Sequence, residues 1–144
     1  MADESHKLKA EVLTPDGKIF EGELFQLSAR TVVGEVGVRA RHAPMLARLV
    51  PSTLRLFEEE SDLGSNDGGE RWITAEGWLE VFANRVTVLV SEAHETGSLD
   101  TSDLKSKLDD AEQRLSEAEE DSAAHRAAEQ DKARYEAFIE ISEG

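Results

Sequence analysis

The stretch GEVGVRARHAP, residues 34–44, decides the fold of this chain. Val36 and Val38 alternate with small or polar residues, and this is the period of a half-buried strand. The stretch closes on Pro44, whose ring fixes its own φ and biases the preceding residue away from helical angles. We therefore expect a short strand that ends in a rigid turn and presents its side chains in a set geometry.

Short apolar runs of the same period lie on both sides of this stretch. Residues 8–12 alternate between apolar and charged side chains, and residues 86–90 read Val-Thr-Val-Leu-Val, which predicts a buried strand. Short strands at close spacing without an intervening helix predict an all-β sandwich or barrel over residues 8–92, after a flexible N-terminus at residues 1–7.

Two further features of this part of the chain lead to predictions. Residues 58–70 combine Ser, Asp, Asn and glycine with acids, a composition typical of an exposed loop between strands. Trp72, Trp78 and Phe82 fall in predicted strands. We expect them in the core rather than on a stacking platform, because aromatic side chains dominate protein cores.

The composition becomes helical after Gly97, because no proline follows and the next glycine is Gly144. Apolar residues recur at helical steps in two stripes. The first comprises Leu104, Leu108, Ala111, Leu115 and Ala118, and the second comprises Ala124, Ala127, Ala128, Tyr135, Phe138 and Ile141. We predict a linker at residues 93–99 and an antiparallel two-helix hairpin at residues 100–144, with Asp100 or Thr101 as the N-cap. The fold class is therefore α+β.

Charge and composition exclude several functions. A net charge of −15 argues against nucleic-acid binding, which needs clustered Lys and Arg. Residues 98–144 alone carry fourteen Asp and Glu against six Lys and Arg, a net charge of −8. The chain has no cysteine and no apolar run near the roughly 20 residues that span a bilayer. Any membrane association is expected to go through a partner.

No arrangement of residues predicts a catalytic or metal site. The four histidines lack the spacing of metal ligands, and neither glycine-rich phosphate-binding motif nor a nucleophile elbow is present. His42 has two open interpretations. It bonds a loop carbonyl near Pro44, or it is an interface group exposed by the rigid turn.

The chain resembles the epsilon subunit of bacterial F-type ATP synthase, and is similar to the chloroplast epsilon and mitochondrial delta subunits of plants. The resemblance covers nearly the whole chain. It rests on these motifs: Gly34 to Val38, His42-Ala43-Pro44, Gly77-Trp78-Leu79-Glu80-Val81, Val86 to Val90, Leu99-Asp100, and Ala111-Glu112-Gln113-Arg114-Leu115.

This resemblance implies a non-catalytic central-stalk subunit at the cytoplasmic face of the bacterial cell membrane, held there peripherally. The β sandwich is expected to bind the gamma subunit and the c-ring. The hairpin is expected to lie against the sandwich or to extend toward the alpha and beta subunits of the catalytic head, where it inhibits ATP hydrolysis. The other class of function that we weigh is a free-standing β-sandwich binding module with a self-associating helical tail.

The resemblance also implies candidate residues. The gamma and c-ring interface would include Gly34, Glu35, Gly37 and His42. The regulatory hairpin would use Arg126, Lys132 and Arg134. The chain departs from its relatives just before His42, where Ala40-Arg41 replace Pro-Gly or Pro-Asn.

Some relatives bind ATP on the hairpin through the motif Ile/Leu-Asp-x-x-Arg-Ala. The matching residues here are 99–104, and Asp103 stands where the arginine would be. A carboxylate repels a triphosphate, so Arg126, which aligns with a second arginine of those relatives, would act without its partner. We expect no physiologically useful ATP binding and no cofactor.

Overall fold

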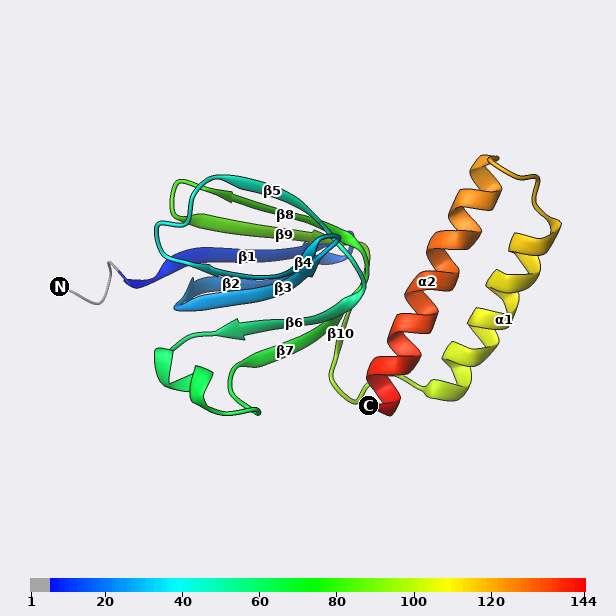
Figure 1. Ribbon diagram of the computed structural model, residues 1–144. Helices are drawn as coiled ribbons and strands as arrows, with labels where there is room; N and C mark the ends of the chain where they lie inside the picture. The colour runs from blue at the N-terminus through cyan, green and yellow to red at the C-terminus, as the bar shows by residue number, and fades with distance from the viewer. Residues whose placement is uncertain (1–5) are drawn as a thin grey trace. The chain divides into compact units, whose positions relative to one another are not determined.

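The computed structural model describes residues 6–144, which form two units that divide between His94 and Glu95. The first unit consists of strands and the second of helices (Figure 1). The strands are β1 (Leu8–Thr14), β2 (Gly17–Leu24), β3 (Gln26–Thr31), β4 (Gly34–Arg39), β5 (Met45–Leu49), β6 (Ser52–Phe57), β7 (Glu70–Thr74), β8 (Gly77–Phe82), β9 (Arg85–Val90) and β10 (Ala93–Glu95), and the helices are α1 (Thr101–Glu117) and α2 (Ala123–Glu143).

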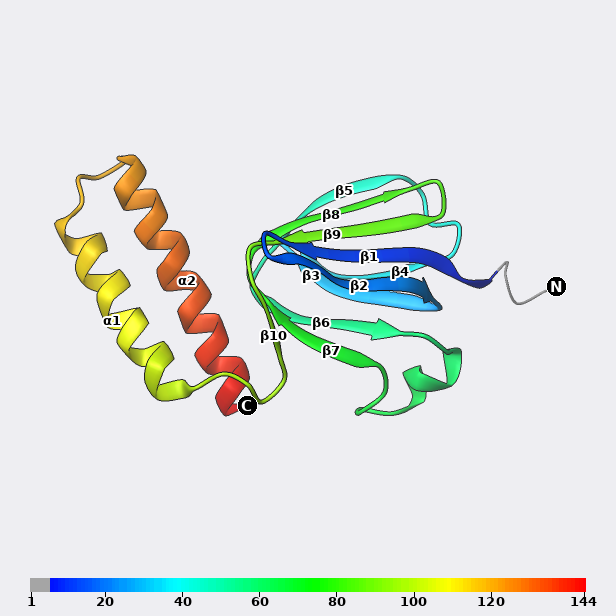
Figure 2. The same ribbon diagram turned by 180° about the vertical axis from the view of Figure 1, so that it is seen from behind.

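The ten strands form one sheet that curls into a sandwich. Its order is β10-β7-β6-β3-β5-β8-β9-β1-β2, with β4 paired to β3 outside this path. The pairs among β1 to β9 are antiparallel, except that β1 and β9 are parallel. Figures 1 and 2 show β5, β8, β9, β1 and β2 as one layer, with β6 and β7 in the other. The fold class expected from the sequence is confirmed.

The alternating residues of each strand build the core between the layers. Leu8, Ala10 and Val12 are at most 1% exposed, as the pattern of residues 8–12 predicts. Val86, Val88 and Val90 are also buried, but Leu89 between them is 49% exposed. The predicted strand at residues 86–90 is therefore confirmed, and it is buried on one face, with Leu89 on the other.

Two segments contain more regular structure than their composition indicates. The loop between β6 and β7 includes a short 3-10 helix, η2 (Glu60–Gly64), none of whose residues is buried. The segment expected to be a linker, residues 93–99, begins with β10, which pairs with β7. Three residues, Ala-His-Glu, are too short for a period to be recognised.

The second unit is a two-helix hairpin in which the helices run side by side. The Asp100 carboxylate caps α1 by accepting from the amides of Ser102 and Asp103. Leu104, Ala111, Ala128 and Phe138 are buried, and an ion pair of 3.0 Å joins Arg114 of α1 to Asp131 of α2.

Part of the predicted seam of α2 is wrong. Ala124 and Ala127 are exposed, whereas the half-buried residue in this turn is His125, which lies three residues before Ala128. Alanine has a small apolar surface, so a stripe of alanines gives weak evidence for which face of a helix is buried.

Candidate functional site

The turn after β4 is held by side chains from distant parts of the sandwich. Arg41 takes a left-handed φ of 63°, which costs a residue with a Cβ about 1–2 kcal/mol. Its amide donates to Asn84 Oδ1 at 2.8 Å, and Asn84 Nδ2 donates in turn to the carbonyl of Lys7. Glycine and asparagine adopt a left-handed angle more readily than arginine does.

His42 follows in this turn and is half-buried. Its Nδ1 lies 2.7 Å from the carbonyl oxygen of Ala43. The interpretation in which His42 bonds a loop carbonyl is therefore confirmed. An interface role for His42 remains a prediction.

The other end of β4 forms a tight hairpin with β3. Thr31 Oγ1 donates to the carbonyl of Gly34 and accepts from the amide of Val33. Gly34 has a φ of 129°, a conformation that favours glycine. Val32 and Val33 at the tip are 59% and 93% exposed.

The structure does not bring the four predicted interface residues together. Gly34 begins β4 and His42 lies beyond its end at Arg39, and the strand itself spans about 17 Å. Glu35 and Gly37 lie on the outer face of the strand, where the Glu35 carboxylate is 3.8 Å from the Arg30 guanidinium. These residues mark one sheet edge rather than a single point of contact.

A second surface was missed by the sequence analysis. Trp78 and Phe82 are 46% and 64% exposed, so the prediction that they are core residues was wrong; Trp72 is half-buried and packs against the core. Four exposed side chains on the outer side of β5, β8 and β9 form what we call the apolar face: Leu46, Trp78, Phe82 and Leu89. Trp78 lies opposite Leu89 in the sheet.

The period of β8 could have revealed this surface. Leu79 and Val81 are buried, and side chains of a strand alternate between faces, so Trp78 and Phe82 must point outward. The aromatic residue type predicts burial of Trp78 and Phe82, whereas the strand period predicts exposure. The structure agrees with the period.

A hollow joins the apolar face to the turn after β4. It is lined from one side by Pro44, Met45 and Leu46 and from the other by Glu80, Val81 and Phe82. Clustered exposed apolar side chains on a folded domain mark an interaction surface. The His42 turn therefore borders a surface suited to binding another protein.

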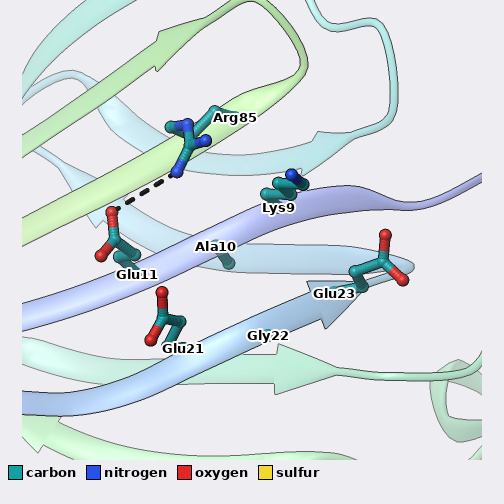
Figure 3. A pocket seen from close by; sticks show the side chains of 7 residues that line it. All are labelled: Lys9, Ala10, Glu11, Glu21, Gly22, Glu23 and Arg85. Carbon is teal, nitrogen blue, oxygen red and sulfur yellow. Dashed lines mark ion pairs between the residues drawn. The ribbon is translucent and has the colours of Figure 1, made fainter.

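A further groove lies on β1, β2 and β9 and is lined by charged side chains (Figure 3). Glu11 is paired with Lys18 at 2.8 Å and with Arg85 at 3.6 Å, and Glu21 is paired with Lys18 at 3.1 Å. The hydrogen bond and charge of Lys18 lower the pKa of Glu11. These carboxylates are satisfied by ion pairs within the sheet, so we assign the groove no ligand.

The three predicted regulatory cations are spread around α2. Arg126 donates to the carbonyl of Asp121 at 2.6 Å, and Arg134 lies 3.3 Å from the Asp131 carboxylate. Positions 126, 132 and 134 are separated by six and two residues, so they point in different directions. They do not form one cationic stripe.

Asp103, which the resemblance aligns with an arginine of some relatives, lies in the first turn of α1 and pairs with Lys107 at 3.2 Å. Within residues 6–144, no three His, Asp or Glu side chains gather as a metal site would require. No helix in this part of the chain is long and apolar enough to cross a membrane.

The geometry defines a class of protein: a β sandwich with an exposed apolar face, followed by a helical hairpin. Residues 7–96 match the model of the ATP synthase delta/epsilon chain β-sandwich domain. The ATP synthase epsilon chain of Halalkalibacterium halodurans is 33% identical over 123 residues, covering 85% of this chain and 86% of that protein. The epsilon chain of Anoxybacillus flavithermus is 34% identical over 108 residues, covering 75% of each.

Solved structures show the same fold. A chain of the Euglena gracilis mitochondrial ATP synthase matches with a TM-score of 0.69 at 21% identity, covering 92% of this chain and 79% of that one. A chain of the central stalk and c-ring of the Tetrahymena thermophila mitochondrial ATP synthase matches with a TM-score of 0.56 at 17% identity, covering 93% and 95%.

The chain therefore belongs to the ATP synthase delta/epsilon family, and its bacterial relatives are epsilon chains. Family membership confirms the expected class of function: an accessory subunit of the ATP synthase that is not itself catalytic.

Proposed function

We propose that this chain is a central-stalk subunit that binds the rotor of an ATP synthase and couples its gamma subunit to the c-ring. Family membership supports the assignment to the complex. The observation that carries the contact itself is the apolar face, where Leu46, Trp78, Phe82 and Leu89 are 46–67% exposed on one side of the sandwich. Burying such side chains against a partner is favourable by about 25 cal/mol per Å² of apolar surface.

The gamma subunit is the proposed occupant of the apolar face. The hollow beside Pro44 extends this face to the His42 turn, which supports a role for His42 at the border of the same contact. The c-ring is the proposed partner of the β3–β4 tip, where Gly34 and Glu35 follow the exposed Val32 and Val33. Gly37, between the two ends, would allow close approach along the strand.

A binding assay with the gamma subunit of the same organism tests the first contact. Replacing Trp78 and Phe82 together by Ser is expected to weaken binding by at least about tenfold, because large aromatic side chains dominate interfaces. Both are exposed, so the fold is expected to tolerate the change. Glu23→Ser, an exposed substitution on the same layer, is the control. Equal affinity of the double variant and the control would contradict the proposal.

A second experiment tests Glu35 and His42 together. A Glu35→Ala and His42→Ala double variant is expected to reduce affinity for gamma or to loosen the coupling of ATP hydrolysis to proton transport. Unchanged affinity and unchanged coupling would remove both residues from the interface. The free-standing binding module, considered from the sequence, predicts instead a homo-oligomer and no complex with gamma.

The hairpin is proposed to regulate ATP hydrolysis weakly through contacts with the alpha and beta subunits of the head. Its net charge of −8 opposes docking on acidic segments, and Arg126 and Arg134 already bond within the hairpin. Deleting residues 98–144 is expected to raise ATP hydrolysis by the complex only slightly. A large release of activity would refute weak inhibition.

ATP itself is not proposed as a ligand. Asp103 places a carboxylate where related chains use an arginine, and its negative charge would repel phosphate groups. Calorimetric titration of the isolated chain with ATP is expected to show no binding in the micromolar range, and micromolar affinity would overturn this expectation. The complex, rather than the chain, is proposed to hold this subunit at the cytoplasmic face of the membrane.

A further inference from the structure

The outer face of β3, β4, β6 and β7 is cationic, although the whole chain has a net charge of −15. Register places eleven side-chain positions of these strands on this face. Four of them are arginines, and Glu35 is the single acid among them. We call this surface the arginine face, and its arginines are Arg30, Arg39, Arg55 and Arg71.

Arg55 and Arg71 lie directly opposite each other across β6 and β7. Like charges in this position destabilise an antiparallel pair. The Nε atoms of both side chains are buried, and among the described residues neither has a hydrogen-bond partner. A buried donor without a partner is costly, so the isolated chain carries an unfavourable arrangement at this point.

The remaining contacts of Arg55 fix the guanidinium without neutralising it. One terminal nitrogen donates to the carbonyls of Gly68 at 2.8 Å and Asn66 at 3.3 Å, and the group stacks 4.7 Å from the centre of the Phe57 ring. These contacts orient the side chain, and none of them brings a carboxylate to it. An anion placed between the two guanidinium groups would balance the charge of this pair.

Neighbouring groups extend the row of donors across the sheet. Ser28 lies opposite Arg55, and Gly37 lies opposite Ser28. The amide of Gln26 donates to Ser28 Oγ at 2.7 Å, which leaves the Ser28 hydroxyl proton available to donate. Gly37 adds no side chain, so the row is open at this end.

We propose that the arginine face binds an acidic polypeptide segment of a partner, with one carboxylate on the Arg55 and Arg71 pair and others on Arg30 and Arg39. Arginine binds carboxylates through paired N–H donors, with a planar geometry that suits this pair. The four arginines extend over four strands, about 14 Å across the sheet. This distance is larger than one small anion, and several carboxylates along a polypeptide segment could extend over it. This contact is separate from the apolar face, which lies on the other layer of the sandwich.

NMR titration of the full-length chain with a peptide of ten glutamates tests the proposal at low salt. Peptide binding is expected to shift the Nε–H signals of Arg55 and Arg71 and the amide signals of Ser28 and Gly37. An Arg55→Gln and Arg71→Gln double variant is expected to bind at least about tenfold more weakly, because charge-assisted hydrogen bonds are lost. An Arg48→Gln and Arg85→Gln double variant, with the same charge change on the opposite layer, is expected to bind within about twofold of the unmodified chain.

Three outcomes would overturn the proposal. Equal weakening by both double variants would show attraction by net charge alone. If inorganic phosphate, added at the same total charge as the peptide, causes the same shifts with the same affinity, the face is a small-anion site. Binding to vesicles containing anionic phospholipid through the same signals, without binding to the peptide, would assign the face to a lipid surface. An Arg71→Gln variant keeps the test independent of folding, because Arg71 makes no hydrogen bond through its Nε and its loss relieves the like-charge pair.

Discussion

Gly77 shows how a single backbone position constrains this fold. It pairs with Val90 in β9 and with Leu49 in β5, so a strand lies on each side of it. A Cβ at this position would overlap the carbonyl oxygen of Leu89, which is held in the sheet and cannot move aside cheaply. The glycine is therefore required by close packing rather than by a turn.

We predict that Gly77→Ala lowers the free energy of unfolding by about 1–3 kcal/mol, because the added methyl group overpacks a well-ordered site. Chemical denaturation of the full chain measures this change. Gly64→Ala is the matched control, since a Cβ at Gly64 would meet no atom within 4 Å, and it is expected to change stability by less than about 0.5 kcal/mol. Equal effects would contradict the argument.

Glu11 makes the stability of the sandwich depend on pH. Its folded-state pKa lies below the ordinary value of 4.5, mainly because Lys18 donates a hydrogen bond to it. A lowered pKa gives stability that is present above the ordinary value and is lost as the pH falls through the folded value. Glu11→Gln should therefore lower the melting temperature at pH 7, and the difference should close at an acidic pH well below 4.5.

Glu23→Gln makes the same chemical change on the neighbouring strand and serves as the control for this prediction. No ion pair of Glu23 is found within the described part of the chain, so a smaller change in melting temperature is expected. Thermal melting curves of the two variants at neutral and at acidic pH measure these differences in melting temperature. A Glu11→Gln effect that persists unchanged at low pH would show that the side chain acts through packing and not through its charge.

At the scale of elements, the hairpin illustrates how neighbouring alanines can differ in role. Ala127 is exposed and Ala128 is fully buried between the helices, although both lie in the stripe predicted from the sequence. Ala128→Leu is expected to destabilise the hairpin by about 1–3 kcal/mol through overpacking, whereas Ala127→Leu is expected to change it by less than about 0.5 kcal/mol.

Helical circular dichroism during thermal unfolding measures both alanine variants. The two changes are chemically identical and lie one residue apart, so intrinsic helix propensity cancels in the comparison. The reverse order of effects would mean that the seam follows the alanine stripe of the sequence and not the packing observed.

For the whole molecule, the division after His94 has a consequence for folding. The sandwich has a continuous core of its own, and the hairpin buries only Leu104, Ala111, Ala128 and Phe138. A chain of residues 1–97, which retains β10, is expected to unfold cooperatively with strand-type circular dichroism. Residues 98–144 alone are expected to be less helical than in the full chain, because short helices with little core are marginal.

The control for this prediction is a shorter sandwich that ends at residue 91 and lacks β10. Removing β10 leaves the β7 edge unpaired, so this fragment is expected to unfold at a lower temperature than residues 1–97. A fragment of residues 1–97 that remains unfolded would show that the sandwich core is not sufficient by itself.

The sequence by itself determined the class of fold and the family. Alternation of apolar residues gave most of the strands, the Asp100 cap and the change of composition at Gly97 gave the hairpin, and the motifs from Gly34 to Leu115 predicted the family that the comparisons confirm. These features are local, and local patterns are what a sequence states directly.

Only the tertiary structure decided which strands lie side by side, and therefore which exposed side chains share one surface. Trp78 and Phe82 were expected in the core, yet strand period turns them outward, and the register of four strands brings distant arginines onto one face. Register and pairing are long-range properties, since a shift of one residue would reverse every side chain. For that reason the interaction surfaces, unlike the strands that carry them, could not be derived from residue type alone.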